Sequence, residues 1–198
     1  MFSGLSSPVQ GDRIRLRWTT ESDLNAILGL EQDEENRAYI IPWTYEQHRA
    51  ACSDPDLAHC IIETNQESTL IGFLLLAGRE SAHQSVEFRR VVIADKGKGY
   101  GREVLKLVKQ LVFEQWKAHR LWLDVFDDNH RARHVYASEG FVEEGVLREC
   151  VVRGEHFESL VIMSLLAQEY FHAQNPSLSQ AAVAHGLNVQ SIDGKSKI

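Results

Sequence analysis

The sequence lacks the features that mark membrane, secreted and nucleic-acid-binding proteins. Its longest apolar runs, such as residues 70–77, fall far short of the roughly 20 residues that a membrane-spanning helix needs, and residues 1–17 contain no signal-peptide core. Its 3 cysteines are odd in number and have no paired metal-ligand spacing, which favours reduced thiols over disulfides or a metal site. A net charge of -7 provides no basic surface for nucleic acid and mildly favours cationic small partners. We therefore expect a cytoplasmic protein that binds neither metal, nucleic acid nor membrane.

The length of 198 residues suits one domain with a substantial core and a short extension. The apolar share of 43% and the charged share of 25% are ordinary for a globular protein and exclude a wholly disordered chain. Pro176 and Gly186 bracket a weak helical pattern near the end, and the last residues are polar. We predict a domain over residues 1–166 and a weakly helical or disordered tail over residues 167–198.

Hydrophobic periodicity predicts a mixed α/β (α+β) domain. Alternating and β-rich runs predict strands over residues 13–19, 59–64, 69–77, 86–94, 121–126, 141–152 and 155–166. Helical spacing predicts helices after Thr20, over residues 45–52, 102–117 and 129–139, the first two with capping boxes. Hairpins flank a single strand–helix–strand crossover in this order. The prediction is a mixed, mostly antiparallel central sheet with helices on both faces and one parallel pair.

A glycine-rich segment stands between the predicted strand 86–94 and the helix that follows. It reads Lys96-Gly97-Lys98-Gly99-Tyr100-Gly101 and is followed by Arg102. Glycines let the backbone approach a pyrophosphate, the helix start attracts anions, and the lysines and arginine add positive charge. The spacing fits neither a P-loop, which needs a lysine where Tyr100 stands, nor the dinucleotide fingerprint, which needs a glycine in place of Arg102. The alternative is a flexible turn with solvated lysines.

Two motifs together resemble the GNAT superfamily of N-acetyltransferases. The coenzyme A loop of that family reads Gln/Arg-x-x-Gly-x-Gly/Ala, with Lys96 here in the first place. Residues 129–141, with Asn129, Ala132, Tyr136, Gly140 and Phe141, resemble its Asn-x-x-Ala-x-x-x-Tyr-x-x-x-Gly-Phe helix. The resemblance covers roughly residues 13–166 and is greatest for the branch of spermidine acetyltransferases and ribosomal-protein N-terminal acetyltransferases.

This resemblance implies a GNAT-like fold and acetyl-CoA as co-substrate. It implies an enzyme that transfers the acetyl group to a primary amine, with a polyamine or another small amine favoured. An N-terminal acetyltransferase acting on a protein such as a ribosomal protein is one alternative, and a non-catalytic acyl-CoA sensor is another. A homodimer is compatible with the sequence.

The resemblance also places the cofactor and a candidate base along the strand before the loop. Glu87 is the candidate base, and strict alternation predicts that it shares a face with Arg89, Val91 and Ile93. A surface glutamate paired with Arg89 is the alternative. Backbone amides of Val91, Val92 and Ile93 are expected to stabilise the thioester oxyanion. The loop from Lys96 to Arg102 is expected to bind the pyrophosphate.

Tyr136 is expected beside the sulfur of coenzyme A. Because a phenol pKa of ~10 lies above a thiol pKa of ~8.5, a hydrogen bond to the sulfur is favoured over proton donation, with simple packing as the alternative. Asn129 is expected to cap its helix and to hold the pantetheine amide.

An acidic cluster ends the first predicted helix. Its members are Glu31, Asp33, Glu34 and Glu35. The cluster is expected either to attract a cationic acceptor or to form a solvated turn.

Overall fold

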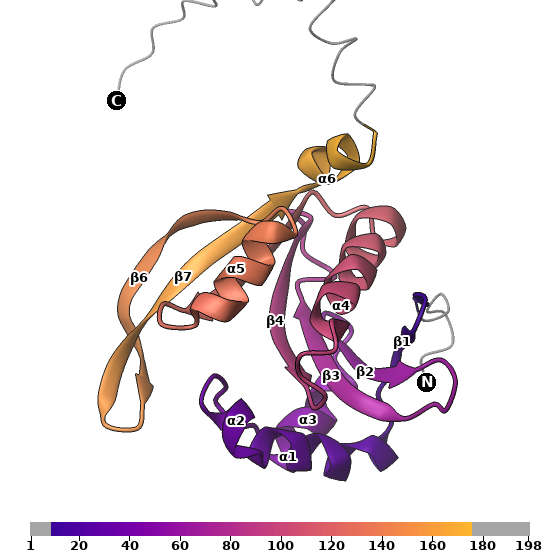
Figure 1. The fold of residues 1–198 in the computed structure, drawn as a ribbon, viewed down its shortest axis with the longest axis vertical. Helices are drawn as coiled ribbons and strands as arrows, with labels where there is room; N and C mark the ends of the chain where they lie inside the picture. Colours follow the sequence, from indigo (N-terminus) through magenta and orange to yellow (C-terminus); the bar gives the residue numbers. More distant parts are fainter. Residues whose placement is uncertain (1–8, 176–198) are drawn as a thin grey trace, which may run out of the picture.

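The computed structural model describes residues 9–175, which form a seven-stranded sheet covered by helices (Figure 1). The strands are β1 (Ile14–Trp18), β2 (Ala58–Thr64), β3 (Leu70–Ala77), β4 (Ser85–Ile93), β5 (Arg120–Phe126), β6 (Val142–Arg153) and β7 (His156–Leu166). The helices are η1 (Glu21–Asp23), α1 (Leu24–Gln32), α2 (Glu34–Arg37), α3 (Tyr45–Ala51), α4 (Tyr100–Lys109), η2 (Gln110–Gln115), α5 (His130–Ser138) and α6 (Ala167–Gln174).

The strand order is β1-β2-β3-β4-β5-β7-β6. Only β4 and β5 run parallel among these pairs, and α4 connects them. The predicted mixed, mostly antiparallel sheet with one β–α–β crossover is confirmed.

Helix ends follow the local sequence. The Thr20 amide donates to the Asp23 carboxylate at 2.8 Å, where η1 begins. The Thr44 amide donates to the Gln47 side chain at 2.8 Å, at the start of α3. Gly140 follows α5 with φ of 97°, the left-handed conformation expected there. These helix ends agree with the predicted capping signals. Each cap involves residues only a few positions apart, so the local sequence is enough to predict it.

The long helix predicted over residues 102–117 is present in two parts. α4 ends at Lys109, and η2 continues it with π-type hydrogen bonds, seen in the Trp116 amide bonding the Leu111 carbonyl at 3.0 Å. The apolar face of α4 is buried against the sheet, including Val104, Leu105 and Val108. Helical periodicity thus located the helix but not its change of winding.

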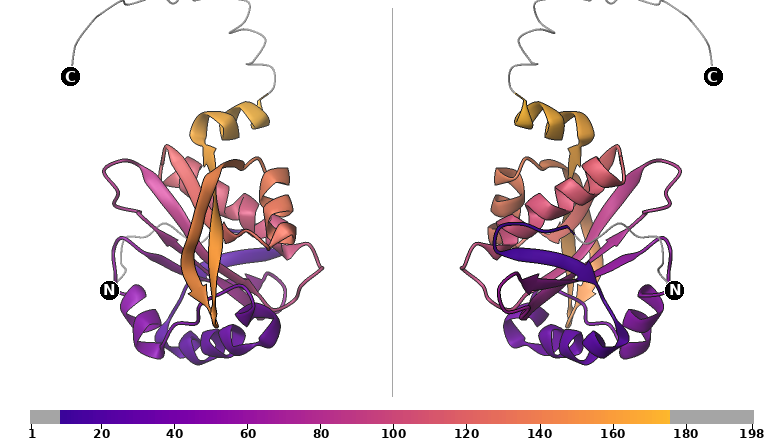
Figure 2. Two further views of the ribbon diagram at one scale, coloured as in Figure 1. Left: turned by 90° about the vertical axis from the view of Figure 1, so that its left-hand side faces the viewer. Right: turned by 90° about the vertical axis from the view of Figure 1, so that its right-hand side faces the viewer.

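Two hydrophobic cores lie on opposite faces of the sheet. The larger one is formed by α4, η2 and the strand side chains that face them, and α5 packs against it. The smaller one joins Leu24 and Ile27 of α1 to Ile61, Phe73 and Val92 of β2, β3 and β4. The helices α1, α2 and α3 gather at one end of the molecule, and α6 lies at the other end (Figures 1 and 2). Helices on both faces were predicted.

The domain boundary predicted at residue 166 stays a prediction. Directly after it, α6 places Tyr170 in the larger core, where its ring stacks on Phe113 at 5.0 Å. Most of the predicted tail, residues 176–198, lies outside the described residues. Within residues 9–175, no helix has the length and hydropathy needed to cross a membrane.

Candidate active site

Two glycines shape the loop between β4 and α4. Gly97 and Gly99 have φ of 81° and 80°, a left-handed conformation that costs other residues about 1–2 kcal/mol. Gly99 is the N-cap of α4, and no side chain in the described part of the chain caps that helix end. The amides of the first turn of α4 are therefore open to an anion, and the helix dipole favours negative charge there. This geometry fits a bound pyrophosphate.

The cations around this loop are already paired with carboxylates. The pairs are Lys96 with Glu35 (3.0 Å), Lys98 with Asp95 (2.9 Å) and Arg102 with Glu139 (3.6 Å). The exposed pairs of Lys96 and Lys98 contribute about 1 kcal/mol or less each, so an incoming phosphate can replace their carboxylates at small cost. Backbone amides, rather than unpaired positive charge, are therefore the groups that this loop leaves open to an anion.

Arg13 braces the loop from β1, a contact that sequence analysis missed. Its guanidinium donates to the Lys98 carbonyl at 3.0 Å and to the Glu103 carboxylate at 2.9 Å, and it stacks on the Tyr100 ring at 4.9 Å. Arg13 and Lys98 are 85 positions apart in the chain. No local pattern predicts such a contact.

A bulge at Arg89 changes which side chains of β4 face the larger core. The register between β3 and β4 skips this residue. Val91 and Ile93, after the bulge, pack against the larger core, whereas Glu87, before it, lies on the opposite face. The prediction that Glu87 shares a face with Val91 and Ile93 is therefore wrong, whereas its predicted proximity to Arg89 is confirmed. One extra residue shifts the alternation of the strand by one position.

Beyond Glu87, β4 and β5 separate. They pair only between residues 85–87 and 120–122, while β5 continues to Phe126 along β7. The backbone of Val91, Val92 and Ile93 that points toward β5 is therefore not used by the described sheet. An extended pantetheine arm can bond to such a backbone edge as an added strand does.

Glu87 stands where this gap opens, with its side chain 17% exposed. Its carboxylate accepts hydrogen bonds from Arg89 at 3.0 Å and 2.7 Å. The ion pair expected as the alternative to catalysis is thus present. A role as base requires the carboxylate to exchange Arg89 for the acceptor amine.

α5 brings Tyr136 to the side of the gap that faces the larger core. Burial, and after it the charge of Asp124, raises the pKa of Tyr136 to about 12. Proton transfer from this phenol to a thiolate of pKa ~8.5 is unfavourable by about 5 kcal/mol, so hydrogen bonding to the sulfur is the better role. Asn129 caps α5 by accepting a bond from the Ala132 amide at 3.1 Å, as predicted.

Comparison with known proteins decides the family. The family model of the acetyltransferase (GNAT) domain matches residues 13–142. The chain belongs to the GNAT acetyltransferase family. Its fold, and acetyl-CoA as its co-substrate, follow from that membership, so the enzyme class predicted from the two motifs is confirmed.

Similar proteins include polyamine acetyltransferases. The chain is 26% identical over 168 residues to the spermidine N(1)-acetyltransferase of Vibrio cholerae, which covers 81% of this chain and 96% of that protein. It is 26% identical over 143 residues to the spermine/spermidine N(1)-acetyltransferase of Bacillus subtilis, covering 68% and 91%. A crystal structure of spermidine N-acetyltransferase from Vibrio cholerae in complex with CoA and spermine has a TM-score of 0.73 at 27% identity, covering 80% of this chain and 98% of that one.

The acidic cluster of this GNAT domain does not act as one solvent-facing group. Glu31 is 0% exposed. Asp33 accepts the Glu35 amide at 3.0 Å and so caps α2, while Glu35 also pairs with Lys96. The hypothesis of a cation-attracting cluster therefore fails for Glu31, and the exposed members remain compatible with it.

Buried Glu31 binds groups from three parts of the GNAT domain. Arg90 of β4 donates to one carboxylate oxygen, the Trp43 amide donates to the other at 2.8 Å, and His48 Nε2 lies 3.3 Å from it. Burial alone would raise the pKa of Glu31, but the bonds from His48, Trp43 and Arg90 outweigh it and lower the pKa. Arg90 also donates to the Ile41 carbonyl at 2.8 Å and stacks on the Trp43 ring at 4.7 Å. Residues 41–43 are thereby fixed to β4.

Two buried histidines extend this network. His48 Nδ1 lies 2.9 Å from His59 Nε2, and His59 Nδ1 lies 2.8 Å from Thr19 Oγ1. Both rings pack against Phe73, each at 5.6 Å between centroids. Burial, and after it the neighbouring His48, lowers the pKa of His59 to about 4. His59 is therefore neutral at pH 7.

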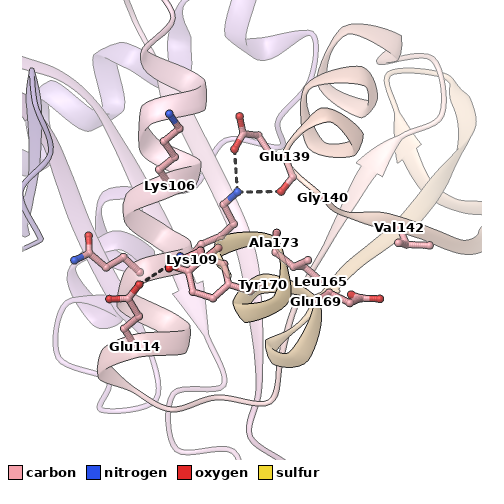
Figure 3. Close-up of a pocket in the computed structure, with 12 residues that line it drawn as sticks. Lys106, Lys109, Glu114, Glu139, Gly140, Val142, Leu165, Glu169, Tyr170 and Ala173 are labelled. Carbon is pink, nitrogen blue, oxygen red and sulfur yellow. Dashed lines mark hydrogen bonds and ion pairs between the residues drawn. The ribbon is translucent and has the colours of Figure 1, made fainter. Parts of the chain in front are cut away.

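A groove of about 690 Å³ lies beside the C-terminal end of α4, away from the glycine loop at its start (Figure 3). Within it, Lys109 donates to the Glu139 carboxylate and carbonyl, both at 2.9 Å. Tyr170 donates to Glu114 at 2.6 Å. These groups satisfy one another, and the groove is separate from the gap between β4 and β5.

Proposed function

We propose that this GNAT enzyme transfers the acetyl group of acetyl-CoA to a primary amine of a polyamine such as spermidine or spermine. The gap between β4 and β5 carries the proposal, because it offers an open backbone edge with Glu87 on one face and Tyr136 on the other. The named relatives, and the similar structure that holds CoA and spermine, support a polyamine over a protein N-terminus or a sensor role. The net charge of -7 also favours a polycation.

The proposal keeps the cofactor contacts expected from the sequence. They are Val91, Val92, Ile93, Lys96, Gly97, Lys98, Gly99, Tyr100, Gly101, Arg102 and Asn129. In this arrangement the loop amides bind the pyrophosphate, and the edge of β4 binds the pantetheine arm and the thioester oxygen. The open amides at the start of α4 and the divergence of β5 support these roles.

Catalysis in this proposal needs a carboxylate for the amine and a donor for the sulfur. A polyamine nitrogen with a pKa of ~10.4 is almost wholly protonated at pH 7, so its proton must leave before attack. A carboxylate on the face of the sheet opposite the larger core, here the acceptor face, serves that purpose, and Glu87 is the one predicted from the sequence. Tyr136 donates a hydrogen bond to the sulfur as the thiolate departs.

The test is coenzyme A thiol release from acetyl-CoA with a panel of acceptors. We expect turnover with spermidine or spermine that exceeds turnover with amino acids, aminoglycosides and a peptide that carries the N-terminal sequence of a ribosomal protein. Preference for the peptide would overturn the polyamine assignment. Tight binding of acetyl-CoA without turnover of any acceptor would favour a sensor.

We further propose a cytoplasmic homodimer. Unpaired Cys52, Cys60 and Cys150 among the described residues support a reducing compartment. Large apolar side chains are exposed along the β6–β7 ribbon and support self-association: Val142, Val146, Leu147, Val152 and Phe157. One similar spermidine N-acetyltransferase is described as dodecameric. Light scattering should give at least twice the 22.5 kDa chain mass, and Phe157→Ser should lower it.

A further inference from the structure

The sheet places a second carboxylate on the acceptor face beside the gap. Along β5, Leu121, Leu123 and Val125 are buried in the larger core, so Trp122 and Asp124 point to the opposite face. Glu87 is in register with Trp122 in the last parallel pair and shares that face. Asp124 comes two residues further along β5, after β4 has left it, and its neighbour on the other side is Ile162 of β7. Asp124 therefore stands at the opening of the gap.

The surroundings of Asp124 differ from those of Glu87. Glu87 already accepts two hydrogen bonds from Arg89. Among residues 9–175, no hydrogen bond or ion pair engages the Asp124 carboxylate, and the residue is exposed. The charged groups near Asp124 are Glu87 and Arg89 of β4. The charge of Asp124 in turn raises the pKa of Tyr136 in α5. Its partner on β7 is the apolar Ile162. Asp124 is thus accessible to an incoming amine.

Charge balance favours one ammonium group at this point. Glu87, Arg89 and Asp124 together carry one net negative charge when all are ionised. One alkylammonium ion makes the group neutral without breaking the pair between Glu87 and Arg89. Partial burial, and after it the charge of Glu87, raises the pKa of Asp124, while Arg89 opposes the shift. A carboxylate with a raised pKa accepts a proton more readily than an ordinary aspartate does.

We propose that Asp124, rather than Glu87, receives the ammonium group of the acceptor and takes up its proton. This inference rests on the proposed function. The first proton moves from the alkylammonium to the Asp124 carboxylate and then to water. The nitrogen lone pair forms a bond to the thioester carbon, and the carbon–sulfur bond breaks. The second proton leaves the nitrogen as the amide forms and ends on the departing thiolate, which gives free coenzyme A thiol.

Asp124→Asn tests the proposal, with Glu87→Gln as the comparison and Glu67→Gln in the exposed β2–β3 turn as the control for lost charge. We expect Asp124→Asn to lower kcat/KM for spermidine at pH 7.5 by about 100-fold or more, the range of a lost general base. The dissociation constant for coenzyme A, measured by calorimetry, should stay within twofold, which also reports correct folding. Glu67→Gln should match the wild type, and Asp124→Glu should recover part of the rate.

The pH profile separates a proton acceptor from a structural aspartate. Between pH 7.5 and 9.5 the neutral fraction of an amine with a pKa of ~10.4 rises about tenfold per unit, so the deficit of Asp124→Asn should shrink in the same proportion. A deficit that stays constant with pH would overturn the proposal. The proposal would also be overturned if Asp124→Asn kept a kcat/KM within threefold of the wild type. A deficit that shrinks at high pH in Glu87→Gln but not in Asp124→Asn would overturn it as well. Absence of spermidine turnover in the wild type would instead contradict the proposed function.

Discussion

Replacing Glu31 by glutamine should strongly destabilise the domain, although the two side chains are nearly equal in size. The substitution keeps the size of the side chain but removes the charge that neutralises Arg90. The Arg90 side chain is 9% exposed and the Glu31 side chain is 1% exposed, so water cannot replace the lost partner. Removing one member of a buried ion pair costs about 3–5 kcal/mol. For a domain of this size, that corresponds to a fall in Tm of about 6–20 °C.

The assay is urea and thermal unfolding followed by circular dichroism at pH 7.5. Glu34→Gln, at an exposed residue of the following helix α2, is the matched control and should change the free energy of unfolding by less than about 0.5 kcal/mol. The double variant Glu31→Met with Arg90→Met should recover only part of the loss, since apolar residues leave no unpaired charge but also leave the Trp43 amide without its acceptor. Equal stability of Glu31→Gln and Glu34→Gln would refute the reasoning.

Three further outcomes follow from the described contacts. Because the pKa of His59 is about 4 in the folded protein against 6.5 as its ordinary value, the unfolded chain binds more protons between these pH values. The free energy of unfolding should have its full value above pH 6.5 and fall by up to about 3 kcal/mol toward pH 4. In urea titrations at several pH values, His59→Gln should show a smaller change of this free energy with pH than the wild type, and an equal change would contradict the assignment. Gly99→Ala should raise the coenzyme A dissociation constant about 5- to 30-fold, because the free loop relaxes from the left-handed conformation and must return to it on binding. Gly29→Ala, whose added methyl group meets no described atom within 4 Å, should leave the constant unchanged in calorimetry. Tyr136→Phe should lower kcat about 10- to 100-fold with little change in KM for acetyl-CoA, and an unchanged kcat would argue against contact with the sulfur.

Features that depend on neighbouring residues could be predicted from the sequence. The capping pair of Thr44 and Gln47, the stop at Gly140 and the glycine loop each involve a few consecutive positions. The helix between β4 and β5 could also be predicted, since the spacing of its apolar residues is a local pattern. Two separate motifs then sufficed to identify the family and its co-substrate.

Features that depend on pairing between distant segments could not be predicted. The bulge at Arg89 exists only relative to β3, and strict alternation misplaced Glu87 as a result. Arg13 of β1 contacts the glycine loop between β4 and α4, 85 positions away in the chain. Glu31 belongs to an acidic run, which indicates solvent exposure, yet Arg90 from a remote strand buries it. Asp124 carries no motif, and its position becomes meaningful only when β4 is seen to diverge from β5.

The bulge in β4 makes the length of this strand more important than its composition. A substitution between residues 85 and 93 alters one side chain, and a neighbour can adjust to it. Deletion of Arg89 would remove the bulge, restore one regular register with β3 and keep Val91 and Ile93 on the larger core, whereas insertion of one residue between Val91 and Ile93 would exchange the inward and outward side chains at the end of the strand. A single-residue insertion in this segment should therefore lower activity far more than deletion of Arg89 does, even where every individual position tolerates substitution.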